Sequence, residues 1–246
     1  QGEVVLLTLA HAEGIDLPAF SAGAHIDLHL AEDLVRPYSL CGDPQNRQHY
    51  QLGILKESQS QGGSRAVHAL REGDRIQVSD PRNLFALDET ASHSLLIGGG
   101  IGITPMLAMA AELHAAGRSF SLHYCARSRA QAAFIAQLEQ AAWADRVHLH
   151  FSDTQRLNLA AVLSDVPANT HVYTCGPTRL MDAVTDVALG QGYRPEQVHQ
   201  ECFSAEVDTG GAAFEVFAAT SGITVQVLQN QSIVEALALA GLKVCV

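Results

Sequence analysis

Apolar and polar residues alternate in short runs through residues 1–90. Glycine and proline separate these runs, and short strands with a turn about every ten residues are typical of a small antiparallel barrel or sandwich. One helix is expected among them, at residues 65–70, and a connector at 81–90. The predicted strands are residues 4–9, 25–30, 50–56 and 75–79.

Short apolar runs alternate with longer helical patterns between residues 91 and 205. This repetition of strand and helix predicts βαβ units and a parallel sheet. Thr104 is expected to cap the first of these helices and Pro105 to lie in its first turn. The predicted strands are residues 94–97, 120–125, 147–151 and 171–174, and the predicted helices are residues 106–116, 130–142, 158–163 and 178–189.

The pattern changes again after residue 206. Two β-rich runs flank Ser221-Gly222, which is a hairpin signal, and a helix at 232–240 follows with Ser232 as its cap. A hairpin and one helix, about 40 residues, can hardly bury a core of their own. We therefore predict a multidomain α+β and α/β chain, in which residues 206–246 are only the beginning of a third domain.

Composition narrows the class of protein. Hydrophobic residues make up 47% and charged residues 17%, so packed domains are expected rather than long disordered tracts. A formal net charge of −11 argues against a nucleic-acid partner, because an acidic surface repels phosphates. The five cysteines form no CxxC pair and no zinc spacing, which favours reduced thiols in a cytoplasm. No apolar run is long enough for a membrane span, no signal peptide is visible, and the missing initiator Met suggests a native start before Gln1.

A glycine-rich segment, residues 98–105, joins a predicted strand to a predicted helix. Glycines let a pyrophosphate approach the backbone, and the helix N-terminus offers free N–H groups and partial positive charge. We assign Gly99, Gly100, Gly102 and Thr104 to such a phosphate site. Since the third glycine of the usual GxGxxG is replaced by Ile, an ordinary glycine-rich turn is the alternative.

A second segment, Cys175-Gly176-Pro177, follows a strand of the same sheet. Ligands of open α/β sheets bind beyond the carboxyl ends of the strands. A cysteine there can touch a flat ring, and Gly176-Pro177 begins the next helix. Taken alone, the segment would be interpreted as a buried cysteine before a turn. Beside the glycine-rich loop it forms a second wall of one site.

A third segment, residues 36–40, combines side chains suited to a phosphorylated ring. Arg36 can fork onto a phosphate, Tyr38 offers a face for stacking, and Ser39 offers a hydroxyl to a ring nitrogen. In a regular strand Arg36 and Tyr38 point one way and Ser39 the other. The alternative is a plain edge strand that contains Pro37.

Gly62-Gly63-Ser64 precedes another predicted helix and forms a second candidate anion cradle. A loop that caps a helix is its alternative. Two cradles in separate domains suggest two phosphorylated cofactors.

Basic residues follow the second strand of the parallel sheet. No acidic residue stands there to bind a ribose 2′-hydroxyl, whereas Arg127 and Arg129 could bind a 2′-phosphate. The sequence is therefore compatible with NADPH as well as NADH. A solvated basic turn is the alternative. The twelve histidines are scattered, and His199 with Glu201, two apart on an expected strand, is weak support for a metal.

These segments, in this order, resemble the ferredoxin–NADP reductase superfamily, and within it the family of phthalate dioxygenase reductase and vanillate demethylase reductase. The resemblance extends over essentially the whole chain, including Ala126-Arg127-Ser128 and residues 199–203. It implies an antiparallel FMN-binding barrel at 1–90 and an NAD(P)-binding α/β domain at 91–205. It also implies that 206–246 begins a β-grasp ferredoxin domain.

The resemblance also implies residue roles. Ser39, Cys175 and Glu201 would be catalytic, with Ser39 near the reactive edge of the flavin and Cys175 by the nicotinamide. Tyr38 would lie against the flavin ring, and Glu201 and Phe203 would border the place where the two rings meet. The other residues assigned to cofactors are Arg36, Gly62, Gly63 and Ser64 at the FMN phosphate, Gly99, Gly100, Gly102 and Thr104 at the dinucleotide phosphates, and Leu40, Gly53, Lys56, Arg127, Ser128, Gly176 and Pro177.

The family normally ends in a plant-type [2Fe–2S] domain, whose cysteines are spaced C-x4-C-x2-C with a fourth one later. Beyond residue 206 the sequence holds Cys245 alone, and one cysteine cannot hold the cluster. No cluster ligand set is therefore assigned within the chain. Either the protein is truncated or further residues follow Val246, and we expect the second, because the beginning of a domain should not be stable without its core.

The function implied is that of a reductase component of a Rieske-type oxygenase system. Hydride from NADH or NADPH would reach FMN, and single electrons would pass through [2Fe–2S] to a terminal oxygenase. The alternatives are a stand-alone NAD(P)H:flavin or acceptor reductase, against which residues 214–246 argue, and a non-catalytic nucleotide-binding electron-transfer subunit, against which Tyr38, Ser39 and Cys175 argue. We expect a cytoplasmic protein with no nucleic-acid or membrane partner.

Overall fold

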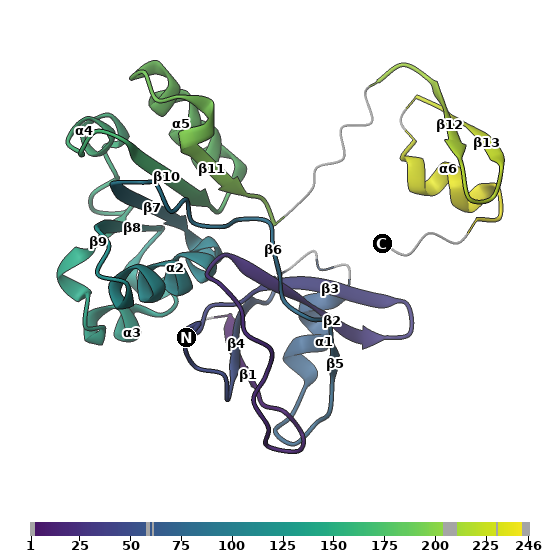
Figure 1. Ribbon diagram of the computed structural model, residues 1–246, viewed down its shortest axis with the longest axis horizontal. Coiled ribbons are helices and arrows are strands. Elements are labelled where there is room, and N and C mark those ends of the chain that lie inside the picture. The colour runs from purple at the N-terminus through teal and green to yellow at the C-terminus, as the bar shows by residue number, and fades with distance from the viewer. Residues whose placement is uncertain (1–2, 58–59, 61, 204–210, 230, 243–246) are drawn as a thin grey trace. The chain divides into compact units, whose positions relative to one another are not determined.

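The computed structural model describes residues 3–57, 60, 62–203, 211–229 and 231–242. The chain forms two compact units, Gln1–Phe203 and Ser204–Val246. In the first unit, Figure 1 shows an antiparallel part joined to a parallel sheet that carries helices on both faces. The candidate site lies in this first unit.

Two short antiparallel sheets form the N-terminal part. On β2 (Ala24–Ala31), buried Ala24, Ile26 and Leu28 alternate with more exposed residues, as the sequence pattern predicts. Val67 of α1 (Gly63–Ala69) joins the core that these residues form. The strand predicted at 75–79 is shorter, because only Gln77–Val78 pairs with β2 there. The strand pairs are β1 (Val4–Leu9) with β4 (Tyr50–Leu55), and β2 with β3 (Leu34–Ser39), β5 (Gln77–Val78) and β6 (Arg82–Asn83).

A five-stranded parallel sheet follows in the order β11-β10-β7-β8-β9, which confirms the sheet type predicted from strand–helix alternation. Its strands are β7 (His93–Gly99), β8 (Phe120–Ala126), β9 (Val147–Phe151), β10 (Thr170–Cys175) and β11 (Val198–Glu201). The helices are α2 (Ile103–Ala115), α3 (Ile135–Gln140), α4 (Leu159–Ser164) and α5 (Thr178–Gly190). Short 3₁₀ turns are η1 (Gly100–Gly102), η2 (Arg129–Gln131), η3 (Ala144–Arg146) and η4 (Pro195–Gln197).

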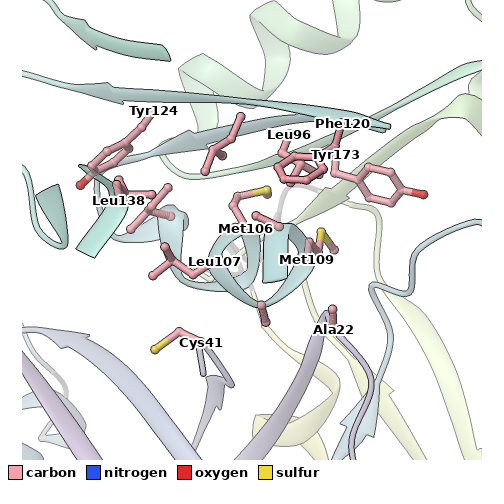
Figure 2. Packing of buried hydrophobic residues seen from close by; sticks show 14 of the residues in the cluster. Ala22, Cys41, Leu96, Met106, Leu107, Met109, Phe120, Tyr124, Leu138 and Tyr173 are labelled. Carbon is pink, nitrogen blue, oxygen red and sulfur yellow. The ribbon is translucent and has the colours of Figure 1, made fainter. Parts of the chain in front are cut away.

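Separate hydrophobic cores cover the two faces of this sheet. The first lies between the strands and α2, and Figure 2 shows some of its members: Leu96, Met106, Leu107, Tyr124 and Tyr173. The second involves α4 and α5 and includes Leu95, Ile97, Leu163, Val172 and Val184. Because β7 and β10 are covered on both faces and buried along their whole length, their carboxyl ends are rigid positions for a site.

The prediction of a single helix at 130–142 is wrong in its first half. Phe134 adopts a left-handed conformation with φ 62°, so η2 and α3 are separate elements. This conformation is unfavourable for a bulky residue, and tertiary contacts hold it. The Ala133 N–H donates to the Tyr124 hydroxyl at 3.1 Å, and the Phe134 ring packs against Gly53. These contacts override the helix propensity of an alanine-rich run.

The prediction that Thr104 caps α2 is also wrong. The cap position belongs to Gly102, and Thr104 is the second helical residue, whose hydroxyl donates to the Ile101 carbonyl oxygen at 3.0 Å. The cause is that η1 leads directly into α2, so the Ile103 N–H is already bonded to carbonyl groups of the 3₁₀ turn. Pro105 lies in the first turn of α2, as predicted.

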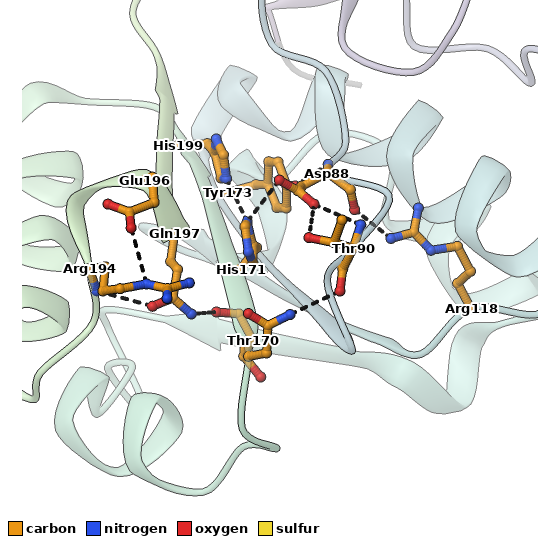
Figure 3. Close-up of polar contacts among 11 residues, drawn as sticks. Asp88, Thr90, Arg118, Thr170, His171, Tyr173, Arg194, Glu196, Gln197 and His199 are labelled. Atoms are coloured by element: carbon orange, nitrogen blue, oxygen red, sulfur yellow. Dashed lines mark hydrogen bonds and ion pairs between the residues drawn. The ribbon is translucent and has the colours of Figure 1, made fainter.

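The connector at 81–90 is fastened to one edge of the parallel sheet. The Asp88 N–H donates to the Tyr173 hydroxyl at 2.7 Å, and the Asp88 carboxylate lies 3.8 Å from His171. His171 in turn lies 3.0 Å from His199 on β11, as Figure 3 shows. Hydrogen bonds from Thr90 lower the pKa of Asp88. Tyr173 and His171 thus hold the connector against β10, and the contact of His171 with His199 extends this group of side chains to β11.

The described residues of the second unit, 211–229 and 231–242, form a hairpin and one helix, as predicted. Strand β12 (Phe214–Ala218) pairs antiparallel with β13 (Ile223–Val227), and Val225 and Val227 pack against Ala236 of α6 (Ile233–Leu239). The Ser232 hydroxyl accepts a hydrogen bond from the Glu235 N–H at 3.2 Å, and the Glu235 side chain completes a capping box. Several large apolar residues of this unit remain exposed, namely Phe214, Phe217, Leu228 and Leu239.

Candidate functional site

The two glycine segments of the parallel sheet meet backbone against backbone. A Cβ atom on Gly102 would stand 2.3 Å from the Cys175 carbonyl oxygen, and one on Gly176 would stand 2.7 Å from the Gly99 carbonyl oxygen. Gly176 also has φ 145°, a conformation that residues with side chains rarely adopt. Both positions therefore require glycine. The fold brings the loop after β7 and the loop after β10 into one surface at the carboxyl edge of the sheet.

Gly100 differs from its neighbours in this loop. It is exposed, has φ 55°, and no atom beyond its own stretch of chain lies within 4 Å of the place that its Cβ would occupy. Its backbone is therefore open to solvent beside the start of α2. The three glycines predicted to contact phosphates thus divide into Gly99 and Gly102, which shape the loop, and Gly100, which leaves the approach to the loop open.

Ser39 and Glu201 connect the antiparallel part to the parallel sheet. Ser39 ends β3, Glu201 ends β11, and the Ser39 hydroxyl donates to Glu201 Oε2 at 2.8 Å. Glu201 is also the register partner of Cys175 in the β10–β11 pair. Burial raises the pKa of Glu201, and the hydrogen bond from Ser39 acts in the opposite direction. The three residues predicted to be catalytic are thus brought together from three strands.

Cys175 is completely buried at the end of β10. Burial raises the pKa of its thiol, and the nearby Glu201 carboxylate acts in the same direction. The side chain is therefore a neutral thiol at physiological pH. Because the thiolate is the reactive form of cysteine, this position suits packing against a ring rather than nucleophilic attack.

Arg36 and Tyr38 lie beside Gly63, where α1 begins. A Cβ atom on Gly63 would stand 2.7 Å from Arg36 Cγ and 3.3 Å from the Tyr38 hydroxyl oxygen. Ser64 is buried, and its hydroxyl accepts a hydrogen bond from the Glu57 N–H at 3.2 Å. Burial raises the pKa of Tyr38, which keeps its phenol neutral. The fold therefore joins the third and fourth predicted segments.

Gly53 lies where the antiparallel part contacts the parallel sheet. A Cβ atom there would stand 2.7 Å from both Thr104 Cγ2 and Phe134 Cζ. Any side chain at Gly53 would push the two parts of the unit away from each other. Sequence reasoning did not identify Phe134, because its alanine-rich surroundings indicate the interior of a helix and no local signal marks its left-handed conformation.

The end of β8 carries the predicted basic residues. Arg127 is exposed, Ser128 is half-buried at the start of η2, and Arg129 Nη2 lies 2.6 Å from Glu139 Oε1. Sequence reasoning did not identify Glu139, since ten positions and the break at Phe134 separate it from Arg129. Arg129 therefore forms an ion pair that the sequence pattern does not reveal.

The remaining predicted residues are dispersed. Leu40 is fully buried in the antiparallel core, Lys56 is exposed after β4, and Gly62 precedes α1 with φ 98°. Phe203 is 47% exposed, and Cys245 lies outside the described residues. Within the described ranges, no group of three or more His, Cys, Asp and Glu side chains is arranged to hold a metal ion, and no helix is long and apolar enough to span a membrane.

Comparison with known proteins gives consistent matches. A family model described as "Dimethylamine monooxygenase subunit DmmA-like, N-terminal domain" matches residues 75–198. Vanillate O-demethylase oxidoreductase of Pseudomonas sp. (strain HR199 / DSM 7063) is 45% identical over 98% of this chain and 78% of its own length. The carnitine monooxygenase reductase subunit of Escherichia coli (strain K12) is 40% identical over 95% of this chain and 74% of its own length.

A solved structure of phthalate dioxygenase reductase, described as modular for electron transfer from pyridine nucleotides to [2Fe–2S], is 35% identical. The two structures match with a TM-score of 0.80, and the match covers 98% of this chain and 77% of the phthalate dioxygenase reductase chain. An antiparallel part followed by a five-stranded parallel sheet places the protein in the class of reductases with ferredoxin–NADP-reductase-like domains. More narrowly, the chain belongs to the family of oxygenase reductases that contains vanillate O-demethylase oxidoreductase and phthalate dioxygenase reductase. The resemblance inferred from the sequence is thus confirmed.

Proposed function

We propose that this chain takes hydride from NAD(P)H onto FMN and passes single electrons through a [2Fe–2S] centre to a terminal Rieske-type oxygenase. The observation that carries the proposal is the 2.8 Å hydrogen bond between Ser39 and Glu201. It joins the strand of the expected flavin site to the strand ends of the expected nicotinamide site. When bound, FMN would supply the chemistry that couples a two-electron hydride donor to one-electron acceptors.

The residues of the antiparallel part fit a flavin phosphate. Gly63 has no side chain, so Arg36 and the start of α1 lie close together, as a cradle around one phosphate requires. The Arg36 guanidinium presents five N–H donors in a fork that matches phosphate oxygens, and Nη1 already donates to the Val35 carbonyl oxygen at 2.7 Å. The Ser64 hydroxyl would supply a further bond. Neutral, half-buried Tyr38 would stack on the ring.

The residues at the carboxyl edge of the parallel sheet fit the nicotinamide cofactor. The open approach at Gly100 would admit the dinucleotide phosphates to the backbone N–H groups before α2. Neutral Cys175 would pack beside the nicotinamide without a charge that disturbs the ring. Glu201 would orient the Ser39 hydroxyl by accepting its hydrogen bond, so that Ser39 Oγ keeps one position at the edge where the two rings meet.

We also propose that the domains extend over 1–90, 91–205 and 206–246, and that the hairpin with α6 begins a ferredoxin domain. The description of phthalate dioxygenase reductase as transferring electrons to [2Fe–2S] supports this assignment. The names of vanillate O-demethylase oxidoreductase and carnitine monooxygenase reductase subunit support an oxygenase as the partner. They favour this function over a stand-alone flavin reductase and over a non-catalytic subunit.

Anaerobic stopped-flow mixing tests the proposed function. Protein reconstituted with FMN should lose its flavin absorbance when it is mixed with NADH or NADPH, and it should bind FMN more tightly than FAD. Ser39→Ala and Glu201→Gln should slow the bleaching, whereas Ser221→Ala, in the hairpin turn of the second unit, should leave it unchanged. A flavin that neither dinucleotide bleaches would refute the proposed function.

A further inference from the structure

We propose that Glu112 is a positioning residue for hydride transfer, because it joins the helix behind the dinucleotide loop to the part of the chain that would hold the flavin. The inference rests on the proposed function, which requires the two rings to meet where β3, β10 and β11 end. A misplacement of about 1 Å can lower the rate of such a reaction by about 100-fold. A contact that fixes the two parts of the first unit against each other therefore also sets the rate.

The contact is a hydrogen bond between the antiparallel part and α2. The Ala22 N–H, in the turn before β2, donates to Glu112 Oε2 at 2.7 Å, and the bond is partly buried. Glu112 lies near the carboxyl end of α2, where the partial negative charge of the helix disfavours a carboxylate. The helix itself therefore gives no reason for an acidic residue at this position, whereas a charge-assisted bond to Ala22 does.

The same turn is held from a second side by the connector. Asn83 Nδ2 donates to the Ser21 hydroxyl oxygen at 2.7 Å and to the Ala22 carbonyl oxygen at 2.9 Å. Asn83 Oδ1 in turn accepts a hydrogen bond from the Phe85 N–H at 2.9 Å. Separate segments thus fix the N–H and the carbonyl group of Ala22, which is 1% exposed. We call residues 21–23 with Glu112 and Asn83 the Ala22 joint.

Helix α2 carries the effect of the joint to the candidate site. At its amino end Thr104 contacts the antiparallel part, since a Cβ atom on Gly53 would stand 2.7 Å from Thr104 Cγ2. Ala22 and Cys41 belong to the buried cluster around the helix, and Figure 2 shows both on the side of α2 away from the parallel sheet. The helix has 13 residues and is about 20 Å long. Contacts near both of its ends fix its tilt, and the sheet packed on it turns with it.

Stopped-flow bleaching of the FMN-loaded chain separates dinucleotide binding from hydride transfer. Glu112→Ala removes the acceptor, so the rate constant at saturating dinucleotide should fall by about 10- to 100-fold, while the dissociation constants of FMN and of the dinucleotide stay within about twofold. Glu112→Asp keeps the charge but is one methylene shorter, and it should lose rate in the same way. Glu112→Gln keeps an oxygen that can accept the Ala22 N–H and should retain most of the rate.

The matched control is Asp186→Ala. Asp186 is an exposed carboxylate in the second half of α5, which has the same length as α2, and its removal should leave the rate unchanged. A second readout is structural and needs no dinucleotide. Residual dipolar couplings of the FMN-loaded chain report the angle between the antiparallel part and the parallel sheet, and amide exchange reports the protection of the Ala22 N–H. Glu112→Ala should change both, whereas Glu112→Gln and Asp186→Ala should change neither.

The failure of this inference can be told apart from the failure of the proposed function. An unchanged rate in Glu112→Ala, an equal loss in Asp186→Ala or in Glu112→Gln, or a loss that disappears at saturating dinucleotide overturns the role of Glu112 while the proposed function stands. Unchanged couplings together with unchanged exchange of the Ala22 amide overturn it as well. A wild-type flavin that neither NADH nor NADPH bleaches refutes the proposed function itself, and the role of Glu112 falls with it.

Discussion

Replacing Gly102 by alanine tests the backbone contact on which the candidate site depends. The new Cβ atom would stand 2.3 Å from the Cys175 carbonyl oxygen and 2.5 Å from the Gly176 nitrogen. Gly102 itself has φ −63° and ψ 0°, which alanine adopts readily. The variant therefore introduces no backbone strain at residue 102. Its whole effect comes from overlap with the end of β10.

The overlap can be relieved only by a shift of backbone that is held on both sides. Real Cβ contacts stay beyond 3.0 Å, so a Cβ at 2.3 Å from the Cys175 carbonyl oxygen forces the two backbone segments to separate. Cys175, however, is paired with Gly98 on one side and with Glu201 on the other. Overpacking of a close-packed site lowers the free energy of unfolding by about 1–3 kcal/mol. Because the clash here is with backbone that is held in place, we expect a loss of about 3 kcal/mol. Displacement of the same loop should also weaken NADH binding by about tenfold or more.

Urea unfolding of the first unit measures the stability, and calorimetric titration measures NADH binding. Gly190→Ala is the matched control, because Gly190 ends α5 and its Cβ would meet no atom within 4 Å. Alanine is favoured over glycine in a helix by roughly 0.5–1 kcal/mol, so the control should be slightly more stable than the wild type. Equal unfolding midpoints for the two variants, together with unchanged NADH binding in Gly102→Ala, would contradict the proposed role of the contact.

Three further predictions follow from single residues. Ser39→Ala removes a donor that favours the ionised form of Glu201, so the pKa of Glu201, already raised by burial, should rise further in a ¹³C NMR titration; an unchanged value would argue against the hydrogen bond. Burial and neighbouring histidines lower the pKa of His123 to about 3, so the unfolded state binds more protons below the ordinary value of 6.5. The contribution of neutral His123 to the free energy of unfolding is therefore fully present above pH 6.5 and decreases as the pH is lowered, by about 2 kcal/mol at pH 5. His123→Gln should flatten this pH dependence in urea titrations. Ser232→Ala breaks the capping box with Glu235 and should destabilise α6 by about 1 kcal/mol, measured as faster amide exchange in α6 and not in α2.

The glycine segments show what local sequence is able to indicate. Residues 98–102 and 175–177 follow apolar strands and precede helical patterns, so their position at the carboxyl edge of a parallel sheet could be predicted. The capping box at Ser232 and the alternation on β2 are local in the same sense. Each of these features depends on backbone conformation or side-chain period within about ten residues, and neighbouring residues in the chain specify both.

Thr104 and the segment 130–142 show where local reasoning was insufficient. Thr104 is a good capping residue by type, but the glycine turn η1 already supplies the bonds that a cap would make. The segment 130–142 has helical composition, but Phe134 is held against Gly53 and interrupts the helix. In the first case an adjacent turn, and in the second a distant tertiary contact, outweighed a preference of less than about 1 kcal/mol per residue.

The sequence by itself therefore determined the kinds of element, the type of the parallel sheet, and the residues suited to phosphates and rings. Only the tertiary structure decided which of these residues meet. Ser39 and Glu201 are 162 positions apart, and they form a hydrogen bond because β3 and β11 end at the same place in the first unit. Arg129 meets Glu139 because Phe134 separates η2 from α3. The physical reason is that strand order and side-chain contacts depend on how apolar faces of distant segments pack, which no local pattern encodes.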